Sequence, residues 1–218
     1  MLLITGTPQS GQALLAGHLL KYDILTSPGA IAQRNFLDPQ IQNINNEILR
    51  LSKCTWCDAP ITSELYSTGA IEYRMSAFLS RYPDIDFLKD SRFCITFRAW
   101  KPLFSDLDFL ICFREPGETA QSLKAQCGLT ISEGLTLWRQ YYQRVVSLNC
   151  AFIEFGSTVP FEDYLDNVGR AFRFLELDVP TEPLHRLWDQ NKIHEYDSVP
   201  LPLPVQKLYQ LLQSRTEN

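Results

Sequence analysis

Residues 6–15, which read GTPQSGQALL, follow a short apolar run at the start of the chain. A strand, a turn between two glycines and then a helix is an arrangement in which main-chain N–H groups bind a phosphate at the start of the helix. Gly6 and Gly11 allow the tight backbone path that such a turn needs. Residues 7–13 could therefore surround a phosphate without a lysine, although a tight strand–helix turn that binds nothing fits the same spacing.

The side chains that a P-loop NTPase uses for catalysis are missing from this turn. Gln12 and Ala13 stand where the Walker pattern has Lys and then Ser or Thr. Gln12 brings no charge to the β- and γ-phosphates, and Ala13 has no oxygen for Mg²⁺. The sequence therefore argues against ATP or GTP hydrolysis and against a P-loop metal ion. A nucleotide that is bound through its 5′-phosphate end without Mg²⁺ remains compatible with it.

Two further basic side chains stand at the ends of predicted strands. Lys89 is near the end of the segment DFLKD, and Arg114 is near the end of the apolar segment LDFLICFRE. A guanidinium at the carboxyl end of a strand can bind a phosphate through two N–H groups. Each side chain could instead form an ion pair, Arg114 with Glu118 or Asp90, and Lys89 with Asp90 or Glu115.

Short apolar runs alternate with helical patterns along the chain. Residues 107–115 form the strongest predicted strand, because a continuous apolar run is typical of a sheet that is buried on both faces. Other strands are predicted at residues 2–5, 86–90 and 150–155, and helices are predicted to begin near residues 11, 39, 70, 116, 131 and 160 and near the C-terminus. This alternation predicts an α/β fold with a central, mainly parallel sheet flanked by helices. Ligands bind such sheets beyond the carboxyl ends of the strands, so the loops after Thr5 and Phe113 and the loop around Lys89 should form the site.

The composition is that of a soluble globular protein. The chain has 218 residues, of which 45% are hydrophobic and 21% charged, and this suits a single domain over residues 1–218 with a helical insert around residues 30–85. The net charge of −5 argues against a nucleic-acid surface. Because there is no run of about 20 apolar residues and no basic leader, we expect no membrane span and a cytoplasmic location. Cys54 and Cys57 have CxxC spacing, but without a second such pair or a nearby histidine we expect two ordinary thiols and no metal site.

Motifs along the chain resemble, in order, those of the P-loop sulfotransferases, most closely the bacterial branch and the tyrosylprotein sulfotransferases. In that family the loop typically reads G-x-P-R-S-G-T-S/T, the middle motif K-D-P-R/F, and the third motif R-x-P followed by a serine. The matching segments here are TGTPQSG (5–11), KDSRF (89–93), REP (114–116) with Ser122, INNEILRLSKCTWCDAP (44–60) and GLTLWRQYYQRVV (134–146). The resemblance covers nearly the whole chain and implies a three-layer P-loop sulfotransferase-like fold.

The resemblance also implies a co-substrate and an acceptor. These are 3′-phosphoadenosine-5′-phosphosulfate and the hydroxyl of a small molecule or carbohydrate, with no metal ion. The 5′-phosphosulfate end would lie in the loop formed by Gly6, Thr7, Pro8, Gln9, Ser10, Gly11, Gln12 and Ala13. The 3′-phosphate would lie on Arg114 and Ser122, and Lys89 would face the charge that develops during transfer. Sulfuryl transfer needs mainly positioning and charge neutralisation from the protein.

Two features depart from the family pattern. Gln9 stands where the loop normally has Arg or Lys, and the loss of one such donor typically costs about 10²–10³ in rate. The glutamate that related enzymes often place after the loop has no clear counterpart. The candidate bases are Asp38, Glu47, Asp58 and His194. His18 lies on the apolar stripe of the first helix and is expected in the core, and His185 is expected on a helix face.

These departures leave two other interpretations open. The chain could be a catalytically degenerate sulfotransferase-fold protein that binds a nucleotide or a partner, because positions 9, 12 and 13 lack the usual side chains. It could also be a P-loop nucleotide kinase, which the absent lysine and the absent Mg²⁺ ligand disfavour.

Overall fold

A computed structural model describes residues 1–21, 38–59, 65, 67–178 and 196–217. Four strands form one sheet in the order β2-β1-β3-β4, and every neighbouring pair is parallel. Their bounds are β1 Leu2–Gly6, β2 Phe87–Lys89, β3 Asp108–Phe113 and β4 Ala151–Glu154. Gly6 lies beside Cys112 in the register of β1 and β3, so the loops after these two strands begin next to each other. The prediction of an α/β fold with a parallel sheet is confirmed.

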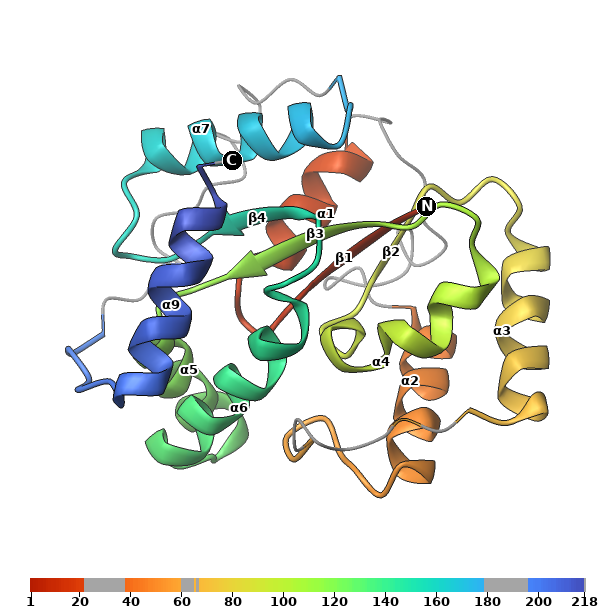
Figure 1. Cartoon of the computed structure of the whole chain (residues 1–218), viewed down its shortest axis with the longest axis horizontal. Coiled ribbons are helices and arrows are strands. Elements are labelled where there is room, and N and C mark those ends of the chain that lie inside the picture. The colour runs from red at the N-terminus through yellow and green to blue at the C-terminus, as the bar shows by residue number, and fades with distance from the viewer. Residues whose placement is uncertain (22–37, 60–64, 66, 179–195, 218) are drawn as a thin grey trace.

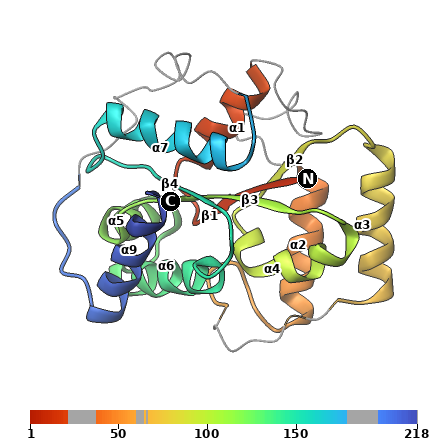
Figure 2. The same ribbon diagram turned by 45° about the horizontal axis from the view of Figure 1, so that its top comes forward.

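Helices cover both faces of this sheet and give the fold three layers (Figure 1). One face carries α1 (Gln12–Lys21) and α7 (Phe161–Phe174). The other carries α4 (Phe93–Trp100) with the short 3₁₀ helix Lys101–Leu103 after it, α5 (Pro116–Cys127), α6 (Ile131–Val145) and α9 (Leu203–Arg215). Figure 2 shows the first pair above the sheet and the others below it. On that lower side α2 (Pro39–Leu51) packs against α4, and α3 (Gly69–Arg81) packs against α2.

Alternate residues of the strands fill two separate cores. Leu2 and Ile4 of β1 belong to the core under α1 and α7, whereas Leu3 belongs to the core of the other face. All three side chains are buried. Because successive side chains of a strand point to opposite faces, a sheet covered on both sides requires a continuous apolar run.

Local signals in the sequence place the ends of α5 and α6. Pro116 opens α5, and Gly128 ends it with a φ of 73°. Thr130 and Glu133 form the expected capping box at the start of α6, in which the carboxylate of Glu133 accepts the Thr130 main-chain N–H at 2.7 Å. Because α5 begins at Pro116, the loop after β3 is short.

Candidate functional site

The loop between β1 and α1 follows a path that requires glycine at its first position. Gly6 has a φ of 150° and Gly11 a φ of 88°. A Cβ atom on Gly6 would lie 2.0 Å from the main-chain oxygen of Cys112 on β3, so no side chain fits there. Gln9, which is exposed, also has a positive φ of 70°. The loop is therefore held in a tight turn against the end of β3.

The main-chain N–H groups of this loop differ in what they bind. The Thr7 N–H donates to the Tyr142 hydroxyl at 3.0 Å. For the N–H groups of residues 9–13, the described part of the chain provides no hydrogen-bond acceptor. Consecutive N–H groups at the start of a helix suit an anion, because the helix dipole adds partial positive charge. This donor set fits a phosphate or a phosphosulfate group.

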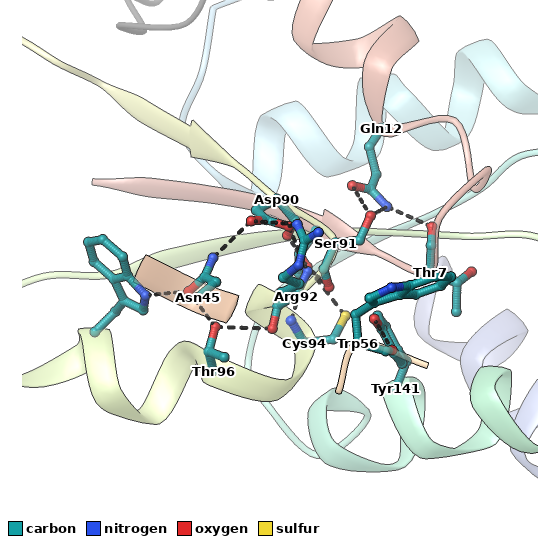
Figure 3. Close-up of polar contacts among 12 residues, drawn as sticks. Thr7, Gln12, Asn45, Trp56, Asp90, Ser91, Arg92, Cys94, Thr96 and Tyr141 are labelled. Atoms are coloured by element: carbon teal, nitrogen blue, oxygen red, sulfur yellow. Dashed lines mark hydrogen bonds and ion pairs between the residues drawn. The ribbon is translucent and has the colours of Figure 1, made fainter. Parts of the chain in front are cut away.

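Gln12 closes the loop from within. Its side chain is buried, and Nε2 donates to the Thr7 carbonyl at 2.7 Å and to the Ser10 hydroxyl at 3.1 Å. Nε2 also lies 3.2 Å from Ser91 Oγ, which ties the loop to the segment after β2 (Figure 3). The sequence shows only that a lysine is missing at this position. In the folded chain the uncharged Gln12 amide donates a hydrogen bond to the Thr7 carbonyl, so the loop keeps its shape without a lysine at this position.

Replacing Gln12 tests whether its hydrogen bonds within the loop stabilise the fold. We expect Gln12→Ala to lower the free energy of unfolding by about 1–2 kcal/mol, because the Thr7 carbonyl loses a buried donor. Gln12→Glu should cost more, since a carboxylate oxygen would then face that carbonyl. Chemical denaturation measures both changes, and Gln143→Ala, at an exposed position of α6, is the matched control. Equal stability of Gln12→Ala and the control would contradict the closure.

A buried network fixes the segment that follows β2. The Asp90 carboxylate accepts from Nη1 of Arg92, from the Arg92 main-chain N–H and from Nδ2 of Asn45, each at 2.9 Å (Figure 3). Asn45 in turn accepts from Thr96 and Trp100, each at 2.8 Å. The ion-pair partner of Asp90 is thus Arg92. The network joins α2 and α4 to the residue that follows Lys89.

The resemblance of residues 44–60 to the sulfotransferases gives Asn45 no role, although the sequence carries a signal for one. Asn45 interrupts the apolar face that Ile41, Ile44 and Ile48 form on α2, and all four side chains are buried. A buried amide must find hydrogen-bond partners, because an unpaired one costs free energy. A polar residue within an apolar helix face is the feature that could have located it.

Lys89 lies in a cavity beside the loop. The cavity has a volume of about 220 Å³ and is lined by Pro8, Trp56, Lys89, Asp90, Ser91, Arg92 and Tyr141. Because Pro8 belongs to the loop, the loop and Lys89 share one cavity. Burial lowers the pKa of Lys89, and the Asp90 carboxylate partly offsets this effect. Tyr141 fixes Trp56 in the wall through a hydrogen bond from its hydroxyl to the Trp56 carbonyl at 2.8 Å.

Arg114 follows the last residue of β3 and is already bound by a carboxylate. Its Nε donates to Oε2 of Glu118 at 2.5 Å, and both side chains are buried. Of the ion pairs left open by the sequence, the one with Glu118 forms, inside the fold rather than on its surface. The guanidinium carbon lies 6.0 Å from the ring centre of Phe155 and 5.1 Å from that of Tyr196. Phe155 also packs on Gly11, where a Cβ would lie 2.6 Å from its Cγ, so this ring connects the loop to Arg114.

Ser122 lies one element further along the chain, in α5. It is buried, and its hydroxyl accepts from Nε2 of Gln126 at 3.3 Å. The described residues thus bring the loop, Lys89 and Arg114 to the same end of the sheet, as parallel strands with adjacent carboxyl ends require.

Comparisons with known proteins identify the fold. No protein-family model matches the chain, and no curated protein matches it in sequence. In structure it is similar to the sulfotransferase domain from the Synechococcus PCC 7002 olefin synthase, with a TM-score of 0.54 and 16% identity over 98% of this chain and 93% of that one. It is also similar to the sulfotransferase domain from the curacin biosynthetic pathway, with a TM-score of 0.50 and 14% identity over 98% of this chain and 97% of that one. The chain has a sulfotransferase fold.

The carboxyl end of β4 in this sulfotransferase fold carries another buried carboxylate. Glu154 accepts from the Tyr209 hydroxyl, and Nε2 of Gln213 lies 3.3 and 3.2 Å from its two oxygens. Burial raises the pKa of Glu154, the two hydrogen-bond donors lower it, and the negative charges of Glu115 and Glu118 raise it further. The ionised form of Glu154 is therefore less stable in the folded chain than in water.

We expect Glu154→Gln to stabilise the sulfotransferase fold at neutral pH. Because the pKa of Glu154 is raised in the folded state, ionisation costs stability once the pH exceeds the unfolded value of 4.5. The gain in Tm should therefore be largest near pH 7–8 and should disappear as the pH falls below about 4. Thermal unfolding across this range measures it, with Asp166→Asn at an exposed position of α7 as the control. A gain that does not depend on pH would contradict this role of burial.

The candidate bases lie in different surroundings in the sulfotransferase fold. Asp38 is the N-cap of α2, and its carboxylate accepts two main-chain N–H groups, the shorter bond being 2.7 Å. Glu47 forms an ion pair with Arg74 of α3. Asp58 is exposed, and the described lining of the cavity contains none of these three carboxylates. His194 lies outside the described residues.

The remaining expectations concern histidines, metal ions and membranes. His18 is buried, and its ring stacks on Phe172 of α7 with ring centres 6.3 Å apart. His185 lies outside the described residues.

Cys54 and Cys57 are free thiols, and the described parts of the chain hold no cluster of three or more His, Cys, Asp or Glu side chains that could bind a metal ion. In those parts, too, no helix has the length and apolar character that crossing a bilayer requires.

Proposed function

We propose that this chain transfers a sulfuryl group from 3′-phosphoadenosine-5′-phosphosulfate to the hydroxyl group of a small-molecule or carbohydrate acceptor. The observation that carries the proposal is the single cavity that Pro8 of the loop shares with Lys89. The N–H groups of residues 9–13 and the ammonium group of Lys89 would then meet one anionic group from two directions. The sulfotransferase fold and the motif resemblance to the bacterial and tyrosylprotein branches support the same activity.

The chain offers a residue for each part of the co-substrate, which supplies an activated sulfuryl group when bound. Residues 6–13 would hold its 5′-phosphosulfate end through main-chain N–H groups. Arg114 and Ser122 would hold its 3′-phosphate, with Glu118 fixing the orientation of the guanidinium. Lys89 would place positive charge where negative charge develops on the leaving oxygen.

Thermal-shift titration without Mg²⁺ tests the nucleotide part of the proposal. We expect adenosine 3′,5′-bisphosphate to raise the Tm in a concentration-dependent way, because a ligand that binds only the folded state stabilises it. Adenosine 5′-monophosphate should raise it less, since it lacks the 3′-phosphate. Stabilisation by ATP with Mg²⁺ alone would instead favour the nucleotide kinase.

Transfer of [³⁵S]sulfate to a panel of hydroxylated small molecules and sugars tests the catalytic part. Labelled product from at least one acceptor is the expected result. Binding of adenosine 3′,5′-bisphosphate without transfer to any acceptor would favour a non-catalytic binding protein. If the nucleotide does not bind at all, the proposed function is wrong.

Gln9→Arg is expected to raise the rate of transfer about tenfold or more. Gln9 is exposed in the loop, and a cation there would add charge stabilisation that its amide lacks. Gln9→Gly is the control, because it relieves the positive φ of 70° without adding charge. Steady-state kinetics and nucleotide affinity measure both variants. An equal gain in the two would mean that the added charge is not the cause, and no gain in turnover or affinity for Gln9→Arg would contradict the role assigned to position 9.

A further inference from the structure

The cysteine pair of the CxxC segment lies next to the wall of the cavity. Trp56, which stands between Cys54 and Cys57 in the chain, lines the cavity together with Lys89. The carbonyl of Trp56 accepts the hydrogen bond from the Tyr141 hydroxyl at 2.8 Å, and Tyr141 lines the cavity as well (Figure 3). The shape of this wall therefore depends on the conformation of the segment between the two cysteines.

A short turn contains the two thiols. The Thr55 main-chain N–H donates to the Asp58 carbonyl at 2.9 Å, and the Asp58 N–H donates to the Thr55 hydroxyl at 3.0 Å. Sγ of Cys54 donates to the Ser52 carbonyl at 3.2 Å, whereas Sγ of Cys57 lies 3.4 Å from the Thr55 hydroxyl. A disulfide sulfur carries no hydrogen, so oxidation would remove the bond to Ser52. The turn would then have to adjust to bring the two sulfurs to about 2.05 Å.

The surroundings of this pair differ from those of the core thiols. Cys57 is partly exposed, so a dissolved oxidant can reach it, and Cys54 behind it is 7% exposed. Burial lowers the pKa of Arg144 on α6, and a negative charge on Cys54 raises it, so this thiol lies near the guanidinium. A thiol reacts as the thiolate, which a nearby positive charge stabilises. Burial raises the pKa of Cys94 and of Cys150 to about 12, which disfavours reaction at those two thiols.

From the paired spacing, the turn and the place of Trp56 we infer that Cys54 and Cys57 form a reversible disulfide in the presence of a small disulfide such as glutathione disulfide, and that this bond displaces Trp56 from the cavity wall. Partly exposed disulfides are more easily reduced than buried structural ones, so reduction should restore the wall. Formation of the bond does not depend on the proposed function, whereas its effect on sulfuryl transfer rests on that function.

The bond forms by two exchange steps. The Cys57 thiolate attacks one sulfur of glutathione disulfide, which gives a mixed disulfide and releases one glutathione thiolate. The Cys54 thiolate then attacks the Cys57 sulfur and expels the second glutathione thiolate. The chain loses two protons and two electrons, and glutathione disulfide takes them up to become two thiols.

Mass spectrometry of the whole chain in glutathione buffers tests the bond itself. We expect a product that is lighter by two hydrogen atoms, in which Cys54 and Cys57 are protected from alkylation until dithiothreitol is added. Cys57→Ser and Cys54→Ala should each abolish this product. Cys127→Ser, which removes an exposed thiol at the end of α5, is the matched control and should still form it. The absence of the lighter product at every ratio of glutathione disulfide to glutathione, or its formation by Cys57→Ser, would overturn the inference.

Tryptophan fluorescence tests the displacement of the wall. Trp56 is one of the four tryptophans of the chain, so the emission of the native chain should change when the disulfide forms. Most of that change should be lost in Trp56→Phe, and dithiothreitol should reverse it in the native chain. An unchanged emission after the disulfide has formed, or an equal change in Trp56→Phe, would overturn the displacement of Trp56.

Transfer assays connect the disulfide to the proposed function. The oxidised chain should transfer the sulfuryl group about tenfold more slowly or worse, since a displacement of about 1 Å in a site can cost about 10²-fold in rate. Cys57→Ser should keep its rate in the same oxidant, and dithiothreitol should restore the rate of the native chain. An equal rate before and after oxidation would refute control of the site by the cysteine pair. If the reduced chain neither binds adenosine 3′,5′-bisphosphate nor transfers sulfate, the proposed function is refuted instead, and the mass and fluorescence measurements still decide the disulfide.

Discussion

Lys89→Met is expected to slow sulfuryl transfer by about 10²–10³-fold. Lys89 lines the same cavity as Pro8 of the loop, so its charge lies where the sulfuryl group would be transferred. Methionine keeps the apolar stem and removes the charge, so the stability of the fold should change little. Affinity for adenosine 3′,5′-bisphosphate, whose 5′-phosphate carries the leaving oxygen, should also fall, but by less than the rate of transfer. Steady-state kinetics and calorimetric binding of that nucleotide separate the two effects.

A control variant and the pH dependence of the rate also test the role of Lys89. Lys101→Met, at an exposed lysine in the 3₁₀ helix after α4, should change neither rate nor affinity. Burial lowers the pKa of Lys89 below 10.5, so its charge is lost at a lower pH than that of an ordinary lysine. The rate of the native chain should therefore begin to fall on the alkaline side earlier than an exposed lysine would allow. Native kcat/KM in Lys89→Met would refute the assigned role. Equal losses in nucleotide affinity and kcat/KM would mean that Lys89 contributes to binding alone.

Gly6→Ala is expected to destabilise the chain by about 3 kcal/mol or more and to abolish nucleotide binding. An added Cβ would lie 2.0 Å from the Cys112 main-chain oxygen and 2.5 Å from Oγ of Ser10. The first atom belongs to a central strand, and the second bonds the Thr7 carbonyl at 2.8 Å, so neither can move without disturbing the site. The φ of 150° adds backbone strain for any other residue. Denaturant unfolding and nucleotide titration measure the two losses.

Two other glycines separate steric clash from backbone strain. Gly128 has a φ of 73° with open space around it, so alanine there should cost about 1–2 kcal/mol from strain alone. Gly69, at the start of α3, has open space and no positive φ, so alanine should change stability by less than about 0.5 kcal/mol. Both variants should still bind the nucleotide. A Gly6→Ala variant as stable as Gly128→Ala would show that β1 and β3 do not approach as closely as described.

The strands and helix ends could be predicted because their signals are local. The apolar run at residues 107–115 contains β3, since a strand covered on both faces needs apolar side chains at successive positions. The Thr130–Glu133 capping box marked the start of α6, because its hydrogen bonds join residues three apart. Gly6 and Gly11 marked the loop because they are only five positions apart in the chain, so this signal is local as well.

The partners within the site could not be predicted in this way. Asn45 and Asp90 are separated by 45 residues, and Trp56 and Tyr141 by 85, yet each pair is joined by a hydrogen bond. In sequence, Asn45 and Trp56 belong to the segment 44–60 that resembles the sulfotransferases, but the resemblance gives neither residue a role or a partner. Their importance comes from the packing of α2 and α6 around the end of β2, which no short pattern describes.

Sequence alone was therefore enough to locate the glycine-flanked loop, to show that it lacks the Walker lysine, and to place Lys89 and Arg114 near the ends of strands. The folded chain was needed to show that Gln12 closes the loop and that Pro8 and Lys89 share a cavity. The physical reason is that local patterns specify elements, whereas the parallel pairing of β1 with β2 and β3 brings their carboxyl ends together. The sequence predicts a parallel sheet, but the order and register of these strands depend on contacts between distant segments, so they become visible only once the chain has folded.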